Sequence, residues 1–178
     1  QFIDESGELV RIVGFGEKYQ VVDGLDHAHW ILTNLRENKI GEPTATLYPR
    51  RLVKLVGEYD PTFSQFADFE YWISLLEHGN LVYIHKPLCS FRLHEGSSTS
   101  AAQHDGRFIT EIFALVSKYY DSSHYREAFS LSSQDRKDVT RQKTLDTLKN
   151  IKDLFLQGKL TRSFTYLSRL IARPHILG

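Results

Sequence analysis

Short apolar runs bounded by polar or turn-forming residues mark the strands that this chain is predicted to contain. The runs are 8–13 ("ELVRIV"), 44–48 ("TATLY"), 81–84 ("LVYI") and 88–94 ("LCSFRLH"). Apolar runs of about four to eight residues are typical of β-strands. A turn is expected at 4–7 ("DESG"), directly before the first run. The first hundred residues are therefore predicted to contain several short strands.

Three segments between these runs repeat apolar residues every three or four positions, which predicts amphipathic helices. The first covers 26–38, with Asp23 or Asp26 as its N-cap, the second covers 50–57 and ends on a glycine, and the third covers 67–78. The apolar stripe expected to be buried in the third helix consists of Phe69, Trp72, Ile73 and Leu76.

The pattern beyond residue 100 is helical throughout, so we expect a mixed α/β part in 1–100 and an all-helical part in 101–178. A turn at 157–159 ("QGK") separates the last two helices as an αα-hairpin. The apolar stripes of this part are Phe108, Ile112 and Leu115; then Leu145, Leu148, Ile151, Leu154 and Phe155; and finally Phe164, Leu167, Leu170 and Ile171.

Composition narrows the class of protein. The 178 residues are 41% hydrophobic and 25% charged, which is typical of a globular protein, and no run approaches the roughly 18 to 20 apolar residues of a membrane span. The single cysteine, Cys89, excludes an internal disulfide and predicts a cytoplasmic location. The sequence contains no methionine, so we expect it to be a piece of a longer polypeptide.

Charge is distributed unevenly, although the net charge is zero. Residues 1–100 carry 9 Lys and Arg against 14 Asp and Glu, whereas residues 101–178 carry 13 against 8. The basic half predicts either an ordinary solvated helical surface or a surface for an anionic partner. Nucleic acid is not expected as that partner, because aromatic and basic residues do not interleave on a recognisable scaffold.

The start of the helix predicted at 67–78 carries two acids, Asp68 and Glu70. The apolar stripe places Asp68 at the edge of the buried face and Glu70 further round, toward solvent. Acids in a first helical turn are stabilised by ~0.3–1 kcal/mol through the helix dipole, so spacing alone favours a structural role. The alternative is that one of the two is a catalytic base.

Basic residues provide a second set of candidates. Arg92 and His94 are two positions apart in a predicted strand and therefore share one face. Arginine offers a fork for phosphate oxygens, and neutral imidazole binds divalent metals; the alternative is an exposed, solvated strand face. Arg50 and Arg51 are interpreted either as acceptor or phosphate contacts or as ordinary surface residues.

The order of these motifs resembles the C-terminal half of the family 2 glycosyltransferases, which have the GT-A fold. The matching segments are "YPRR" (48–51), "GEYD" (57–60), "ADFEYW" (67–72), "GNLVYIHKPL" (79–88) and "FRLHEGSSTS" (91–100). The resemblance covers residues 40–100 closely. It implies an α/β fold in which 1–100 are the acceptor-side half of a GT-A domain and 101–178 a helical C-terminal extension.

This resemblance implies an inverting, hexosyltransferase-like enzyme. A sugar would pass from a nucleotide-diphosphate donor to a hydroxyl of a glycan or lipid-linked acceptor, as in bacterial cell-surface polysaccharide synthesis. Asp68 would be the general base, and residues 95–100 a flap over the donor. His94 would either be a ligand of Mg²⁺ or Mn²⁺ or contact the diphosphate of the donor. The expected substrate contacts are Arg50, Arg51, Glu70, Trp72 and Arg92.

The sequence also departs from the family pattern. Ala67 stands where many members carry the first of two acids, which leaves Asp68 as the acid aligned with the base. The nucleotide-binding half of the family, with its metal-holding D-x-D motif, is not among these 178 residues. We therefore expect the isolated chain to be inactive and to bind no metal, although the full-length enzyme would use one.

A second hypothesis belongs to a different class of function. Residues 101–178 would form a non-catalytic helical module that docks on a partner protein or a membrane surface, motivated by the basic charge and by the stripe from Phe164 to Ile171. The location would then be peripheral to the inner face of the membrane. Both hypotheses can hold together, since a transferase can dock through its extension.

Overall fold

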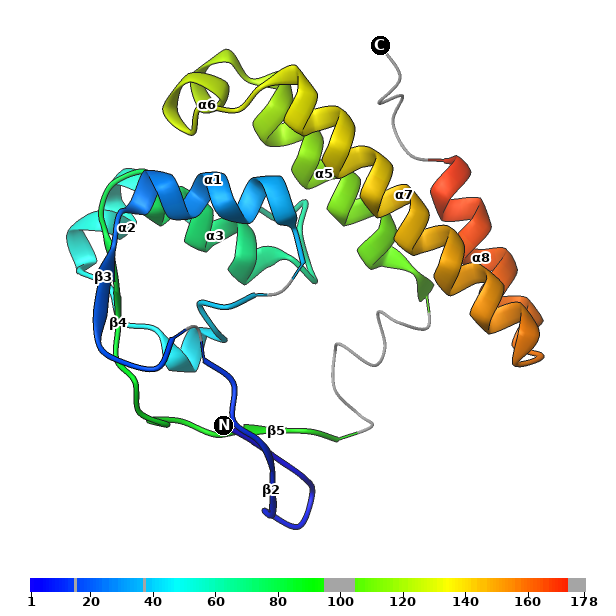
Figure 1. The fold of residues 1–178 in the computed structure, drawn as a ribbon, viewed down its shortest axis with the longest axis horizontal. Coiled ribbons are helices and arrows are strands. Elements are labelled where there is room, and N and C mark those ends of the chain that lie inside the picture. The colour runs from blue at the N-terminus through cyan, green and yellow to red at the C-terminus, as the bar shows by residue number, and fades with distance from the viewer. Residues whose placement is uncertain (15, 37, 95–104, 173–178) are drawn as a thin grey trace.

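The structure, a computed structural model, describes residues 1–14, 16–36, 38–94 and 105–172 and has a mixed α/β fold. Short strands and three helices form one side of the molecule, and α5, α7 and α8 form the other (Figure 1). The boundary predicted near residue 100 and the flap predicted at 95–100 lie outside the described residues. The mixed fold class is confirmed, and the assignment to half of a GT-A domain stays a prediction.

The strands form two small sheets. In the first, β1 (Phe2–Ile3) pairs antiparallel with β2 (Leu9–Arg11) and parallel with β5 (Phe91–Arg92). In the second, β3 (Gln20–Val22) pairs antiparallel with β4 (Leu81–Tyr83). The runs predicted at 8–13, 81–84 and 88–94 therefore do contain strands, each shorter than its run.

The three helices predicted before residue 80 are confirmed. Helix α1 (Gly24–Asn34) has Asp23 as its N-cap, and the Asp23 carboxylate accepts a hydrogen bond from the Asp26 backbone N–H. Helix α2 (Arg50–Val56) ends at Gly57, whose φ of 87° is the left-handed conformation that favours glycine. Helix α3 (Ala67–Leu76) runs beside α1 (Figure 1).

The strand predicted at 44–48 is wrong. Pro43–Ala45 form a single 3₁₀ turn, and the Thr46 hydroxyl donates a hydrogen bond to the Pro43 carbonyl. Proline fixes φ at a value suited to the first position of a helical turn. The strand was predicted from the residues after Pro43, so the prediction left this effect out. Leu47, the apolar residue near the end of this run, is fully exposed.

The C-terminal half of the chain is helical, as predicted. It comprises α5 (Arg107–Asp121), α6 (Ser123–Ala128), α7 (Ser133–Leu156) and α8 (Leu160–Ile171). A capping box between Ser132 and Asp135 starts α7, and Gly158, at a φ of 73°, allows the hairpin turn between α7 and α8.

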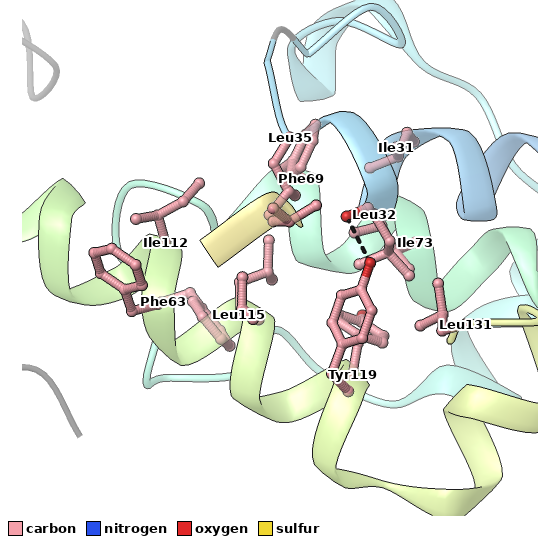
Figure 2. Close-up of a cluster of buried hydrophobic side chains, with 14 of the residues drawn as sticks. Ile31, Leu32, Leu35, Phe63, Phe69, Ile73, Ile112, Leu115, Tyr119 and Leu131 are labelled. Atoms are coloured by element: carbon pink, nitrogen blue, oxygen red, sulfur yellow. Dashed lines mark hydrogen bonds between the residues drawn. The ribbon is translucent and has the colours of Figure 1, made fainter. Parts of the chain in front are cut away.

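One hydrophobic cluster joins the two halves of the chain. It lies between α1, α3 and α5 and takes in Leu131, which precedes α7 (Figure 2). The residues labelled in that view are Ile31, Leu32, Leu35, Phe63, Phe69, Ile73, Ile112, Leu115, Tyr119 and Leu131. Because buried apolar area is the main stabilising contribution to folding, α5 is an integral part of the core on which α3 is built.

Helices α7 and α8 leave much of their apolar surface exposed. In α8 the buried side chains are Ser163, Tyr166 and Leu170, whereas Phe164 and Ile171 are 64% and 74% exposed. No helix in the described residues is long and apolar enough to cross a membrane.

Candidate functional site

Asp68 lies at the second position of α3, partly exposed at the end of the helix that faces the loop 38–42. Its Oδ2 accepts a hydrogen bond of 3.2 Å from the Asn38 amide, and its Oδ1 accepts one of 2.7 Å from the Phe69 N–H. Partial burial raises the pKa of the Asp68 carboxyl, and these two hydrogen bonds oppose that rise. Asp68 is therefore a better proton acceptor than an exposed aspartate.

A second carboxylate, Glu42, shares this region with Asp68. Burial raises the pKa of Glu42, and the negative charge of Asp68 raises it further. A carboxyl whose pKa is raised both by burial and by a neighbouring carboxylate is typical of functional sites, although ion-pair networks also perturb pKa values.

Asn38 fixes the loop that carries Glu42. Its side-chain oxygen accepts hydrogen bonds from the N–H groups of Ile40 and Gly41, and its amide donates to the Gly41 carbonyl as well as to Asp68. Gly41 has a φ of 114°, which other residues rarely adopt. The loop is thereby held over the start of α3.

Trp72 on α3 also holds the loop 38–42 in place. Its indole N–H donates a hydrogen bond of 3.0 Å to the Gly41 carbonyl, and its ring is buried between α3 and the apolar face of α2. The prediction that Trp72 contacts substrate is not tested by this arrangement. The structure places Trp72 beneath the loop, where it supports the position of Glu42.

Two tyrosines, Tyr48 and Tyr59, border the site. The ring of Tyr59 stacks on buried Tyr71, with centroids 4.3 Å apart, and Tyr48 meets both Tyr71 and Trp72 edge to face. Tyr59 is 41% exposed. Partial burial of its hydroxyl and the neighbouring Tyr48 raise the pKa of Tyr59 to about 12, with a small contribution from Asp68. The site therefore combines two carboxylates with an exposed aromatic ring.

The prediction that Glu70 faces solvent is wrong. Its side chain is 3% exposed, and its carboxylate accepts hydrogen bonds from the Lys118 ammonium and the Ser74 hydroxyl. The reason is that α3 is covered on two sides, by α1 and α5 on one and by α2 on the other, so it has no solvated face at this position. The prediction that Glu70 contacts substrate is left without support, because its carboxylate already has partners within the protein.

Arg92 and His94 are not gathered around Asp68. Arg92 lies in β5, well apart from α3 (Figure 1), and its Nη1 donates to the carbonyls of Asp4 and Glu5, 2.9 and 2.8 Å away. These bonds hold the turn between β1 and β2. His94 is exposed just beyond β5. Their roles toward a diphosphate stay predictions.

Arg50 and Arg51 are exposed in the first turn of α2. Neither forms an ion pair with another residue in the described ranges. Because the next turn of α2 packs beside Trp72 and Tyr71, both arginines lie near the border of the aromatic cluster, and their expected contact with substrate also stays a prediction.

The described residues offer no metal centre. No group of three or more His, Cys, Asp or Glu side chains in 1–14, 16–36, 38–94 or 105–172 has the arrangement needed to hold a metal ion. The divalent metal expected in the full-length enzyme, with His94 as one of its ligands, stays a prediction.

Comparison of the chain with protein-family models, with curated proteins and with solved structures gives no match. The site is consequently defined by its own geometry: two interacting carboxylates, a loop held by Asn38 and an aromatic border. Sequence reasoning selected Asp68 but missed Asn38, Glu42 and Tyr59. No spacing rule could have found them, because Asn38 and Glu42 lie in one loop and Tyr59 in another, both outside α3.

Proposed function

We propose that the chain is the acceptor-side half of an inverting glycosyltransferase and that Asp68 is its general base. The observation that carries the proposal is the partly buried Asp68 carboxylate with a raised pKa, set beside Glu42 and an exposed tyrosine ring. A base is most effective when its pKa approaches the working pH, and burial moves an aspartate in that direction.

In this mechanism the acceptor sugar lies over Tyr59, because the apolar C–H face of a sugar ring packs well on an aromatic face. Its reacting hydroxyl donates a hydrogen bond to Asp68. As the hydroxyl oxygen forms its bond to the anomeric carbon, the proton passes to Asp68. The bond from that carbon to the diphosphate oxygen breaks on the opposite face, and the nucleoside diphosphate leaves with the electron pair.

Exposed apolar surface on the two sheets also supports the proposal. Leu9 and Val10 are successive residues of β2 and therefore point to opposite faces, yet both are more than half exposed. Val21 and Val82, which pair across β3 and β4, are exposed in the same way. Sheets with uncovered apolar faces are suited to packing against further structure, and we propose that a nucleotide-binding half covers them.

The experiment that tests this function is a transfer assay on the native protein that contains this chain, with a panel of nucleotide-diphosphate sugars and saccharide acceptors. We expect acceptor-dependent release of nucleoside diphosphate and a glycosidic bond of inverted anomeric configuration. Release that does not depend on an acceptor, or a product that retains the configuration, would contradict the proposal. The same assay without donor sugar is the blank.

A second candidate function, membrane docking, is favoured by one specific observation on α8. Leu160, Phe164, Leu167 and Ile171 follow each other at helical spacing on one exposed face, in a half of the chain that carries five more basic than acidic residues. We propose that this face inserts into the surface of an anionic membrane, where apolar burial and charge attraction act together.

Docking predicts that the chain co-sediments with vesicles containing phosphatidylserine and that high salt weakens this binding. Phe164→Ser is expected to weaken it about tenfold, because an apolar side chain of this size contributes roughly 1.5–3 kcal/mol when fully buried. The matched control is Leu47→Ser, which removes a fully exposed leucine from the other half of the chain. Equal loss in both variants, or no binding at low salt, would exclude this surface.

A further inference from the structure

Glu111, a buried acid on α5, binds the chain segment that leads into α3. Its Oε2 accepts hydrogen bonds from the N–H groups of Ser64, Gln65 and Phe66, at 3.0, 2.7 and 3.1 Å. Its Oε1 accepts a fourth, of 2.6 Å, from the Ser64 hydroxyl. The side chain is only 6% exposed. Four hydrogen bonds to three successive residues fix this turn as a unit.

The bound turn is the N-terminus of the helix that carries Asp68. Phe66 is the N-cap of α3 and has no side-chain cap of its own, and its carbonyl accepts the hydrogen bond from the Glu70 N–H that closes the first helical turn. The free N–H groups at a helix start need partners, and here the partner of the N-cap N–H, that of Phe66, comes from a distant element. Asp68 follows two residues later.

A second contact from α5 supports the same segment. Lys118, two turns further along α5, places its ammonium 2.9 Å from Asp60 and 2.8 Å from Glu70, on either side of the turn. Helix α5 therefore holds residues 60–70 at both ends, and Glu111 holds the middle. Such support is needed because catalytic groups must be held within about 0.5 Å of their productive position.

From this geometry we propose that Glu111 is a positioning residue for Asp68. Glu111 sets where the first turn of α3 begins. The start of this turn determines how deeply the Asp68 carboxylate is buried and how that carboxylate is oriented toward the Asn38 amide. The inference rests on the proposed function only for its catalytic consequence. The positioning itself is a property of the fold that can be measured without turnover.

Two substitutions separate position from charge. Glu111→Asp keeps the negative charge but shortens the side chain by one methylene, so the carboxylate no longer reaches all three N–H groups. Glu111→Gln loses the charge but keeps the length: its oxygen can accept from the N–H groups while its amide donates to the Ser64 hydroxyl. Asp121→Asn, an exposed acid at the other end of α5, is the matched control.

The readout is the pKa of Asp68 in the 178-residue chain, followed by ¹³C NMR of the aspartate carboxyls. The groups facing Asp68 are Asn38, Glu42 and Tyr59, and all three are unchanged in these variants. We expect Glu111→Asp to lower the pKa of Asp68 toward the ordinary value of about 3.9, because the loosened turn lets water reach the carboxylate. Glu111→Gln and Asp121→Asn should leave it at the wild-type value, and amide exchange at 64–66 should accelerate only in Glu111→Asp.

Each other outcome overturns the proposal. If the pKa of Asp68 changes in Glu111→Gln but not in Glu111→Asp, the effect of Glu111 is purely electrostatic. If the pKa changes in neither variant, Glu111 contributes to stability alone. In the native protein, Glu111→Asp should lower the transfer rate about 100-fold with Glu111→Gln close to wild type. If the wild type transfers no sugar, the proposed function fails, while the NMR titration still decides the positioning.

Discussion

Asp68→Asn is expected to lower the rate of sugar transfer about 10³-fold in the native protein while leaving the affinity for the donor unchanged. Asparagine keeps the size of the side chain and its hydrogen bond with the Asn38 side chain, but its amide is not a base at neutral pH. The donor should bind as before, because Asp68 acts on the acceptor hydroxyl. The measurement is single-turnover transfer together with donor titration by calorimetry.

The matched control for Asp68→Asn is Asp26→Asn. Asp26 is also an acid in the first turn of a helix, but it is exposed and lies on α1. We expect no more than a twofold change in transfer for that variant, within the roughly 0.5 kcal/mol typical of surface substitutions. Undiminished transfer by Asp68→Asn would remove Asp68 from the chemistry.

Lys118→Met is expected to lower the free energy of unfolding by about 3 kcal/mol, more than any other substitution proposed for this protein. Lys118 is the cation that balances the Glu70 carboxylate, which is almost fully buried, and it also binds Asp60. Without it, the buried Glu70 carboxylate has no ion-pair partner within 1–14, 16–36, 38–94 and 105–172. Urea denaturation at neutral pH measures the change.

The double variant Lys118→Met/Glu70→Gln should recover much of that loss, because the uncompensated charge is then removed as well. Lys152→Met, an exposed lysine on α7, is the control and should change stability by less than about 0.5 kcal/mol. Equal stability of Lys118→Met and Lys152→Met would show that the ion pairs around Glu70 contribute nothing.

The stability of the wild type should also depend on pH through Asp60. The hydrogen bond from Lys118 is the main cause that lowers the pKa of Asp60 to about 2. Since the pKa is lower in the folded state than in the unfolded state, this group stabilises the fold above about pH 4. The contribution is lost as the pH falls from about 4 to about 2. Asp60 is partly exposed, so screening by solvent reduces this contribution.

Local signals in the sequence predicted much of the fold. Asp23 before an apolar periodic segment predicted α1, and Gly57 predicted where α2 ends, because caps and stop signals act within a few residues. The run at 44–48 was misassigned as a strand, because a run of small and apolar residues does not by itself distinguish a strand from a turn. Pro43 fixed a 3₁₀ turn there instead.

The candidate site was predicted only in part, for a physical reason. The position of Asp68 at a helix start could be predicted from periodicity, but its partners Asn38 and Glu42 come from a loop about thirty residues earlier. Glu70 was misplaced because a single apolar stripe implies one solvated face, whereas α3 is packed on two sides. Glu111 lies in the half of the chain that the sequence pattern set apart from the site.

The most direct test compares two pKa values in the native protein: that of Asp68 from ¹³C NMR, and the apparent pKa at which kcat/KM for transfer declines on the acid side. A general base must be deprotonated to act, so transfer should fall as the pH drops through the raised pKa of Asp68. We expect the two values to coincide and the residual transfer of Asp68→Asn to show no such decline. An acid limb at a different pH, or one that persists in Asp68→Asn, would contradict the role of Asp68 as the base.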